Sequence, residues 1–183
     1  MNISEIADFQ KGFAFKSKDY QDSGVRIIRV TNLNKNDFED RNCMYIDPLK
    51  SQEYLKYVLH ANDAVISTVG SWPTNPESVV GKVCIIPEQI EGSLLNQNAV
   101  RLRAKNGCEQ SYLNYLLLNK DFGSYIVGMA QGSANQASIT LEDIRRYEFD
   151  LPSIERQREI VDILKCIDEK IVNNRKINDN LAA

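Results

Sequence analysis

The sequence is poor in the residues that most catalytic and metal sites require. Among 183 residues there is one histidine, His60, and the four cysteines, Cys43, Cys84, Cys108 and Cys166, form no Cys-x-x-Cys pair. A zinc site would need ligands at spacings that this chain does not contain. A cysteine nucleophile would need a neighbouring base, and His60, the only histidine, could pair with at most one of the four cysteines. The glycine-rich phosphate and dinucleotide motifs, Gly-x-Ser-x-Gly and His-Glu-x-x-His are all missing. We therefore predict recognition rather than bond-making, with no catalytic residues and no metal site.

Long apolar runs and a recognisable signal peptide are also missing. No stretch approaches the roughly 18 consecutive apolar residues that a membrane-spanning helix needs. The first twelve residues lack the charged-then-apolar plan of a secretory signal. We expect a cytoplasmic protein with no membrane association, whose cysteines are reduced and mostly buried.

The chain has no strong excess of charge of either sign. Its 22 basic and 25 acidic residues give a net charge of −3, which excludes a polybasic nucleic-acid-binding protein as a description of the whole chain. Basic residues nevertheless gather in residues 11–29 and 101–105. These two stretches could converge on one phosphate-binding face, or they could belong to an ordinary solvated surface of mixed charge.

The first part of the chain, residues 1–151, mixes short strand and helix patterns. Strands are predicted at residues 25–30, 64–69, 79–86, with a bulge at Gly81, and 98–103, the last half-exposed. Helices are predicted at residues 51–58, 110–119 and 121–129, a further helix starts at Thr140, and residues 71–76 are predicted to form a loop. Because strands and helices do not alternate in βαβ units, the predicted fold class is α+β.

The second part, residues 152–183, predicts one long helix that begins after Pro152 with Ser153 as its cap. Its apolar seam follows the 4-and-3 spacing of a coiled coil, with Asn174 and Asn178 as polar positions. The seam residues that we expect in an interface are Ile160, Leu164, Ile167, Ile171 and Leu181. We favour burial of this seam by a helix from another chain; the alternative is that it folds back on its own domain.

Polar side chains cluster where the predicted elements break. The four clusters lie at residues 31–34, 67–72, 96–98 and 132–138, and the last is expected to be a small flexible loop. Asparagine and glutamine can pair with adenine, and serine or threonine can bind phosphate or base edges. The alternative for each residue is a turn former that bonds its own backbone.

Segments spread along the whole chain carry a family resemblance: residues 6–12, 15–20, 24–32, 62–67 with Gly70, 96–98 and 132–136, then Ile139, Ile144 and residues 151–152, and finally residues 155–160, 167–171 and Asn174. In the order and spacing of these segments, the chain resembles the specificity subunit of type I restriction–modification systems. It is similar to one target-recognition domain, residues 1–151, followed by one conserved spacer helix, residues 152–183. Arg156-Gln157 stands where the family usually has Glu-Gln.

The resemblance implies a subunit that binds double-stranded DNA and has no catalysis of its own. It implies modification subunits that use S-adenosylmethionine to methylate adenine, and a restriction subunit that uses ATP and Mg²⁺; no cofactor is expected on this chain. In the family, two spacer helices pair antiparallel and set the distance between two half-sites. This chain resembles a half-subunit, natural or excised, which could satisfy the same pairing as a homodimer on a two-fold symmetric target.

The residues expected at the DNA are polar loop groups and members of the first basic stretch. They are Lys16, Lys18, Arg29, Asn32, Ser67, Ser71, Trp72, Asn96, Gln97, Ser133, Asn135 and Gln136. Trp72 could instead be a packing residue beside Pro73. Two other functions stay open: a non-catalytic coiled-coil adaptor whose globular domain binds protein rather than DNA, and an enzyme with a pocket that no motif reveals.

Overall fold

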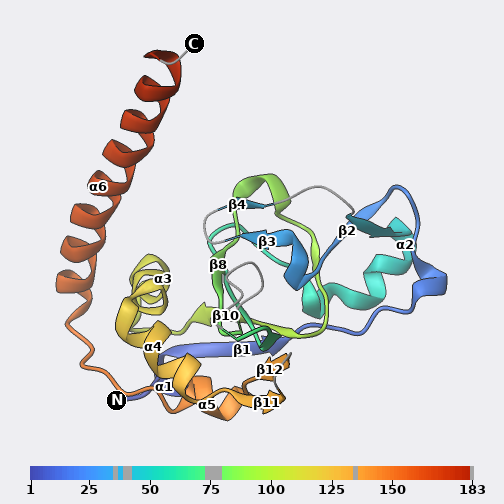
Figure 1. Ribbon diagram of the computed structural model, residues 1–183, viewed down its shortest axis with the longest axis horizontal. Coiled ribbons are helices and arrows are strands. Elements are labelled where there is room, and N and C mark those ends of the chain that lie inside the picture. The colour runs from blue at the N-terminus through green and yellow to red at the C-terminus, as the bar shows by residue number, and fades with distance from the viewer. Residues whose placement is uncertain (35–36, 39–42, 73–79, 134–135, 182–183) are drawn as a thin grey trace.

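The chain combines a β-rich globule with one long helix, α6 (Ile154–Leu181), that stands away from it (Figure 1). The computed structural model describes residues 1–34, 37–38, 43–72, 80–133 and 136–181. The α+β class and the long C-terminal helix are both confirmed. Within this part of the chain, no helix combines the length and the apolar character needed to cross a bilayer.

The centre of the globule is an antiparallel sheet with the strand order β1–β10–β6–β8. Its strands are β1 (Ala7–Lys11), β6 (Ala64–Ser67), β8 (Val83–Ile85) and β10 (Ala99–Ala104). Val100 and Leu102 on β10 face one side of the sheet and Ala99 faces the other, and all three are buried. The predicted strand 98–103 is therefore an interior strand, more buried than a half-exposed one, because both of its faces are covered.

Helices cover one face of this sheet. They are α1 (Ile3–Ile6), α3 (Gln110–Leu118), α4 (Lys120–Gly128) and α5 (Leu141–Arg145). Leu113, Phe122 and Ile126 pack with Val100 and Leu102 in the largest core cluster. The helices predicted at 110–119 and 121–129 are confirmed within a residue at each end. Thr140 caps α5, as predicted, by accepting a hydrogen bond from the backbone N–H of Asp143 at 3.2 Å.

A second layer covers the opposite face. It contains the sheet β5–β2–β9, in which β2 (Val25–Ile28) pairs with β5 (Met44–Ile46) antiparallel and with β9 (Leu94–Leu95) parallel. The short elements of this layer are α2 (Pro48–Ser51), β3 (Leu33–Asn34), β4 (Asp37–Phe38) and the 3-10 helices η1 (Ser17–Asp19), η2 (Val30–Asn32), η3 (Gln52–Tyr57) and η5 (Glu88–Ile90). An aromatic cluster of Phe13, Phe15, Tyr54 and Tyr57 fills its outer end.

Four predicted boundaries in the globule were wrong. The strand predicted at 25–30 ends at Ile28, because the 3-10 helix η2 begins at Val30. In place of the helix predicted at 51–58 the chain forms α2 and then η3. The first begins earlier than predicted because Asp47 accepts hydrogen bonds from the backbone N–H groups of Leu49 and Lys50, and the second is kinked at Tyr54. The strand predicted at 79–86 shrinks to β8, because Gly81 at φ +76° belongs to the preceding turn rather than to a bulge. The strand predicted at 64–69 ends at Ser67 and resumes as β7 (Val69–Gly70). Of the predicted loop 71–76, residues 73–76 lie outside the described part.

The described residues of the polar segment 132–138, which are 132–133 and 136–138, lie in strands, whereas the whole segment was expected to be a flexible loop. β11 (Gln131–Ser133) pairs antiparallel with β12 (Gln136–Ser138), and β12 pairs with β7. Ala137 is fully buried while its neighbours on β12 are exposed, which is the alternation of a strand lying on a core. Asn135 lies outside the described residues.

The long helix begins where the sequence predicts. The hydroxyl of Ser153 accepts a hydrogen bond from the backbone N–H of Arg156 at 3.4 Å. The first half of α6 packs on α3, and the second half extends beyond the globule (Figure 1). Backbone pairing between Asn2 and Glu148 places the first residues of the chain at the base of this helix.

Candidate functional site

The base of α6 is fixed to the globule by a fully buried amide, Gln157. Its Nε2 donates hydrogen bonds to the carbonyl oxygens of Gly107 at 3.1 Å and Pro152 at 2.9 Å. Its Oε1 accepts a hydrogen bond from the backbone N–H of Glu109 at 2.9 Å. Glu109 is itself the cap of α3, so this one side chain joins the start of α6 to the start of α3.

A second polar contact lies three turns further along the helix. The hydroxyl of Tyr115, on α3, donates a hydrogen bond to Oδ2 of Asp168 at 2.7 Å. Burial, and then the hydrogen bond to Asp168, raise the pKa of Tyr115, so the neutral phenol persists well above neutral pH. Between the two contacts Val161 is buried, with 3% of its surface exposed. We call residues 157, 161, 164 and 168 the globule-facing stripe, because they recur at steps of four and three residues.

A different side of α6 carries exposed apolar side chains. Ile163, Ile167, Ile171 and Ile177 are 42–60% exposed and lie on one side of the helix, and we call them the distal stripe. Asn174 and Asn178 fall on the same side. Apolar residues in a row on a projecting helix are typical of a surface that another helix covers.

The predicted interface seam is thus divided between two environments. Ile160 and Leu164 are half-buried, whereas Ile167 and Ile171 are exposed, as an intermolecular interface requires. The side chain of Leu181 lies outside the described residues. At the base of α6 the helix packs on its own domain, which was the alternative considered. For the distal stripe, burial by a helix of another chain stays a prediction.

The β7–β12–β11 sheet brings together four of the residues predicted at the DNA. Nε1 of Trp72 donates a hydrogen bond to the carbonyl oxygen of Ser133 at 2.7 Å, and its ring packs against the core. Ser133 and Gln136 are exposed on the β11–β12 hairpin, and Ser71 is half-buried beside Trp72. We call Ser71, Trp72, Ser133 and Gln136 the hairpin edge. Trp72 therefore has a packing role that also positions the hairpin.

Three of the predicted contacts are buried instead. Asn32, Ser67 and Asn96 are exposed by 1%, 1% and 7%. The Asn32 Oδ1 accepts a hydrogen bond from the backbone N–H of Arg29 at 3.1 Å, and the Asn96 Oδ1 accepts one from Gln97 at 2.7 Å. These two amides form turns, which was the alternative considered for them, and a buried side chain does not reach a DNA groove. We therefore remove all three from the candidate surface.

The two basic stretches do not form one phosphate-binding face. Arg103 pairs with Asp63 at 2.6 and 2.9 Å, Arg101 donates to the carbonyl oxygen of Val58 at 2.8 Å, and Lys105 donates to that of Ser4 at 2.8 Å. The three basic side chains of residues 101–105 are therefore bonded to groups of the globule itself, and we do not propose them as phosphate contacts.

The remaining predicted contacts lie in the second layer. Lys16 and Lys18 are exposed around η1, whose Asp19 pairs with Lys50 at 2.7 Å. Arg29 is half-buried and Gln97 is exposed. The hairpin edge and the η1 lysines are thus two separate candidate regions.

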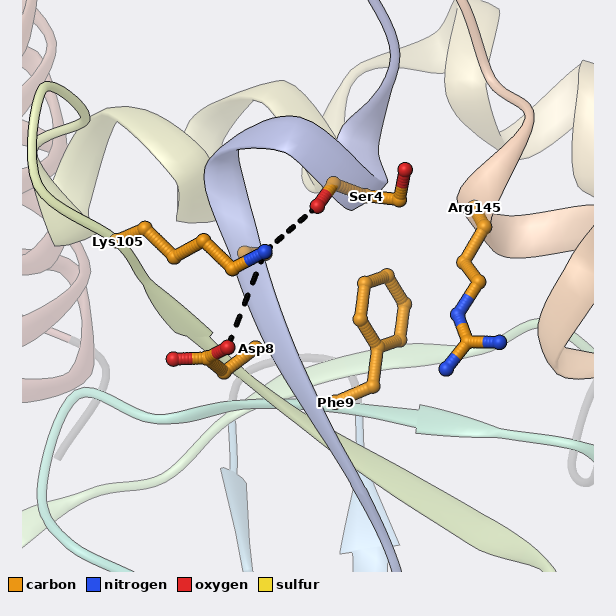
Figure 2. A pocket seen from close by; sticks show the side chains of 6 residues that line it. Ser4, Asp8, Phe9, Lys105 and Arg145 are labelled. Carbon is orange, nitrogen blue, oxygen red and sulfur yellow. Dashed lines mark hydrogen bonds and ion pairs between the residues drawn. The ribbon is translucent and has the colours of Figure 1, made fainter.

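A shallow depression lies along β1 at the edge of the central sheet, and Figure 2 shows the side chains that line it. Lys105 bonds the backbone of Ser4 and lies 3.9 Å from the Asp8 carboxylate. The guanidinium of Arg145 lies 5.2 Å from the centre of the Phe9 ring. Because both cations already have partners in the protein, we assign this depression a structural role.

No group of three or more histidine, cysteine, aspartate or glutamate side chains in the described ranges could hold a metal ion. Cys84 and Cys108 are buried, Cys43 is half-buried and Cys166 is exposed on α6, all as free thiols. The expectation that the cysteines are mostly buried therefore holds for two of the four.

Comparison with known proteins matches the whole chain to one family. Residues 1–183 match the profile of the type I restriction modification DNA specificity domain. The chain is 29% identical over 149 residues to a Methanocaldococcus jannaschii protein described as the type I restriction enzyme MjaX specificity subunit, covering 81% of this chain and 34% of that protein. It is 23% identical over 184 residues to the type I restriction enzyme MjaVIII specificity subunit of the same organism, covering 99% of this chain and 42% of that protein.

Solved structures show the same fold. The S subunit of the type I restriction–modification system from M. genitalium superposes with a TM-score of 0.64 at 18% identity, over 94% of this chain and 39% of that chain. The HsdS subunit from Thermoanaerobacter tengcongensis gives a TM-score of 0.62 at 19% identity, over 94% of this chain and 38% of that one. The chain spans about two fifths of the length of these relatives, or less.

Proposed function

Because this chain belongs to the type I restriction modification DNA specificity domain family, we propose that it recognises a DNA sequence without catalytic groups of its own. The observation that carries the proposal is the family match over residues 1–183. A globule with exposed polar loops, attached to a projecting helix, supports it. On this proposal residues 1–151 read the target and residues 152–183 act as the spacer.

For base reading we propose the hairpin edge, with Gln136 as its leading candidate. Gln136 is exposed on β12, whose backbone is held by β7 on one side and β11 on the other. Glutamine can form two hydrogen bonds with adenine in the major groove. The neighbouring Ser133 presents an exposed hydroxyl from the paired strand, and the Trp72 side chain bonds its carbonyl oxygen.

For phosphate contacts we propose Lys16 and Lys18. Both are exposed near the outer end of the second layer, and lysine contacts with phosphates add affinity without sequence preference. Arg29 and Gln97 stay in the proposed set because part of each side chain reaches the surface.

For assembly we propose that the distal stripe pairs antiparallel with an equivalent helix of a second copy. A helix of 28 residues is about 42 Å long at 1.5 Å per residue, which is enough to separate two DNA-bound globules. Identical globules related by a two-fold axis would read a symmetric target in two parts.

The chemistry would then belong to other subunits. We propose that modification subunits carrying S-adenosylmethionine methylate adenine within the recognised target. A restriction subunit with ATP and Mg²⁺ would carry out cleavage. This chain would bring them to a site and would itself hold none of these cofactors.

Sequencing of methylated adenines tests the proposal directly. The chain would be expressed with a type I modification subunit in cells that lack adenine methylation. We expect methylation at one motif, made of two short half-sites separated by a fixed number of base pairs, and related by two-fold symmetry if the chain pairs with itself. The absence of methylation, together with salt-insensitive binding to protein alone, would favour the adaptor function instead.

Substitution of Gln136 tests the hairpin edge. We expect Gln136→Ala to weaken binding to the motif about tenfold while leaving binding to random DNA unchanged, since a lost bidentate base contact costs about 1–3 kcal/mol of discrimination. Gln52→Ala is the matched control, because Gln52 is an exposed glutamine at the start of the 3-10 helix η3, in the second layer. An equal loss on motif and random duplexes would remove Gln136 from base reading.

A further inference from the structure

We propose that Gln157 and the Tyr115–Asp168 pair are positioning residues that set the number of base pairs between the two half-sites. They would do so by fixing the direction in which α6 leaves the globule. The inference rests on the proposed function, and it adds a specificity determinant made of residues that are not among the candidate DNA contacts.

The first step is the contrast between apolar and polar contacts at the base of α6. Val161 is buried between the two polar contacts. Burial of an apolar side chain attracts the two helices but depends little on direction, so it would tolerate a small roll or slide of α6. Hydrogen bonds weaken steeply when their distance or angle changes. The polar contacts, rather than Val161, therefore determine the direction of the helix.

The second step is the quality of the first contact. All three hydrogen bonds of the Gln157 amide run to backbone groups, at 2.9–3.1 Å, and come from two separate segments. Gly107 and Glu109 belong to the turn before α3, and Pro152 belongs to the segment that leads into α6. An amide held from two sides in this way allows one rotation of α6 about its own axis.

The third step is the distance between the contacts. Gln157 and Asp168 are eleven residues apart, or about 16 Å along the helix axis. If the helix were displaced by about 1 Å at either contact, its axis would tilt by about 3° and the far end of α6 would move by about 2 Å. That displacement is less than the 3.4 Å rise of about one base pair. With one contact alone, a swing of about 10° would move the far end by about 6 Å, which approaches two base pairs.

The experiment uses the motif sequencing described above, with variants of the full chain. The wild-type chain should methylate half-sites at one separation. Tyr115→Phe removes the hydroxyl and keeps the ring, and Gln157→Leu removes the buried amide at similar volume. We expect both variants to keep the same bases in each half-site and to methylate at least one additional separation, at a tenth or more of the wild-type level.

Two matched controls isolate the hydrogen bond from the substitution. Asp168→Asn keeps an oxygen that can accept from Tyr115, so it should retain a single separation. Asp162→Ala removes an exposed carboxylate from another side of α6 and should also leave the separation unchanged.

The outcomes distinguish this inference from the proposed function. A single unchanged separation in Tyr115→Phe overturns the inference and leaves DNA recognition intact. A change in the bases of the half-sites would also overturn the inference, because the two contacts would then affect which bases are recognised rather than the distance between half-sites. If Gln157→Leu does not accumulate as folded protein, Tyr115→Phe decides alone. Absence of methylation by the wild-type chain overturns the proposed function itself.

Discussion

The two halves of α6 carry apolar residues at the same spacing but lie in opposite environments. Val161, in the first half, is 3% exposed because α3 runs beside it, whereas Ile171, in the second half, is 42% exposed. Ile171 belongs to the seam predicted from the sequence, whereas Val161 lies on the globule-facing stripe beside it, and both are apolar positions of an amphipathic helix. Apolar periodicity therefore identifies the helix positions that tend to be buried in an interface. It does not identify whether the same chain or another chain forms that interface.

The polar residues distinguish the two halves more clearly than the apolar ones. Gln157 and Asp168 bond groups of the globule, at the beginning and at the end of the packed half. Beyond Asp168 the described side chains of α6 are all exposed. The first half therefore behaves as part of the globule, and the second half is presented for assembly.

The largest effect is expected from a charge placed in the packed half. Val161→Asp should weaken the packing of α6 on α3 by about 3–5 kcal/mol, because an unpaired carboxylate would be buried there. Hydrogen–deuterium exchange of residues 154–168 measures the loss as faster exchange. Ile171→Asp is the same substitution in the exposed half and serves as the control. If residues 154–168 exchanged at the same rate in Val161→Asp and Ile171→Asp, the difference that we describe between the two halves of α6 would be contradicted.

An intermediate effect is expected at Gln157. Gln157→Leu would leave two carbonyl oxygens and one N–H group buried without their partner. Unsatisfied buried groups cost about 1–3 kcal/mol each. Because Gly107, Glu109 and Pro152 are themselves partly exposed, water can replace part of the lost bonding, and the total should be about 2–3 kcal/mol. Urea unfolding measures the change. Gln131→Leu, at an exposed glutamine of β11, should change the unfolding free energy by less than about 0.5 kcal/mol.

A smaller and pH-dependent effect is expected at Tyr115. Tyr115→Phe should cost about 1 kcal/mol through loss of the hydrogen bond to Asp168. Because the pKa of Tyr115 is raised in the folded chain, its contribution is fully present below about pH 10, the value of an unfolded tyrosine, and falls as the pH rises above it. Unfolding of wild type and variant should therefore converge in alkaline solution. A constant difference up to pH 11 would contradict this assignment.

The smallest effect on stability, and the sharpest test of assembly, is expected on the distal stripe. Ile167→Asp combined with Ile171→Asp should change the unfolding of the globule by less than about 0.5 kcal/mol, since neither side chain touches the core. The same variant should lose self-association or docking to partner subunits, as measured by light scattering. Leu164 is left out of the pair because it is half-buried against its own chain. An unchanged mass would show that the distal stripe is not the interface.

The sequence predicted the elements that depend on local signals. The helices α3 and α4 follow from apolar spacing, α5 follows from the Thr140 cap, and α6 follows from Pro152 and the heptad pattern. Each of these signals lies within about one turn of the residue that it determines. Local signals also give the mixed α+β class, because they show that strands and helices do not alternate.

The candidate site was harder to predict because it depends on contacts between distant segments. Asn96 is buried because β9 adds to β2, about 67 residues earlier, through a parallel pairing. Arg103 is neutralised by Asp63, which lies 40 residues away in sequence. The role of Gln157 was missed for the same reason, since its partners at residues 107 and 109 are about 50 residues distant. The residues that neighbour Asn96, Arg103 and Gln157 in the sequence do not indicate these long-range contacts.

The first residues of the described chain lie at the base of α6, which has a consequence for assembly. The backbone N–H of Ile3 bonds the carbonyl oxygen of Tyr147 at 3.2 Å, seven residues before the helix starts. If two such helices run antiparallel, the tip of one lies near the base of the other. Residues 1–3 of each copy would then border the tip of the helix of its partner.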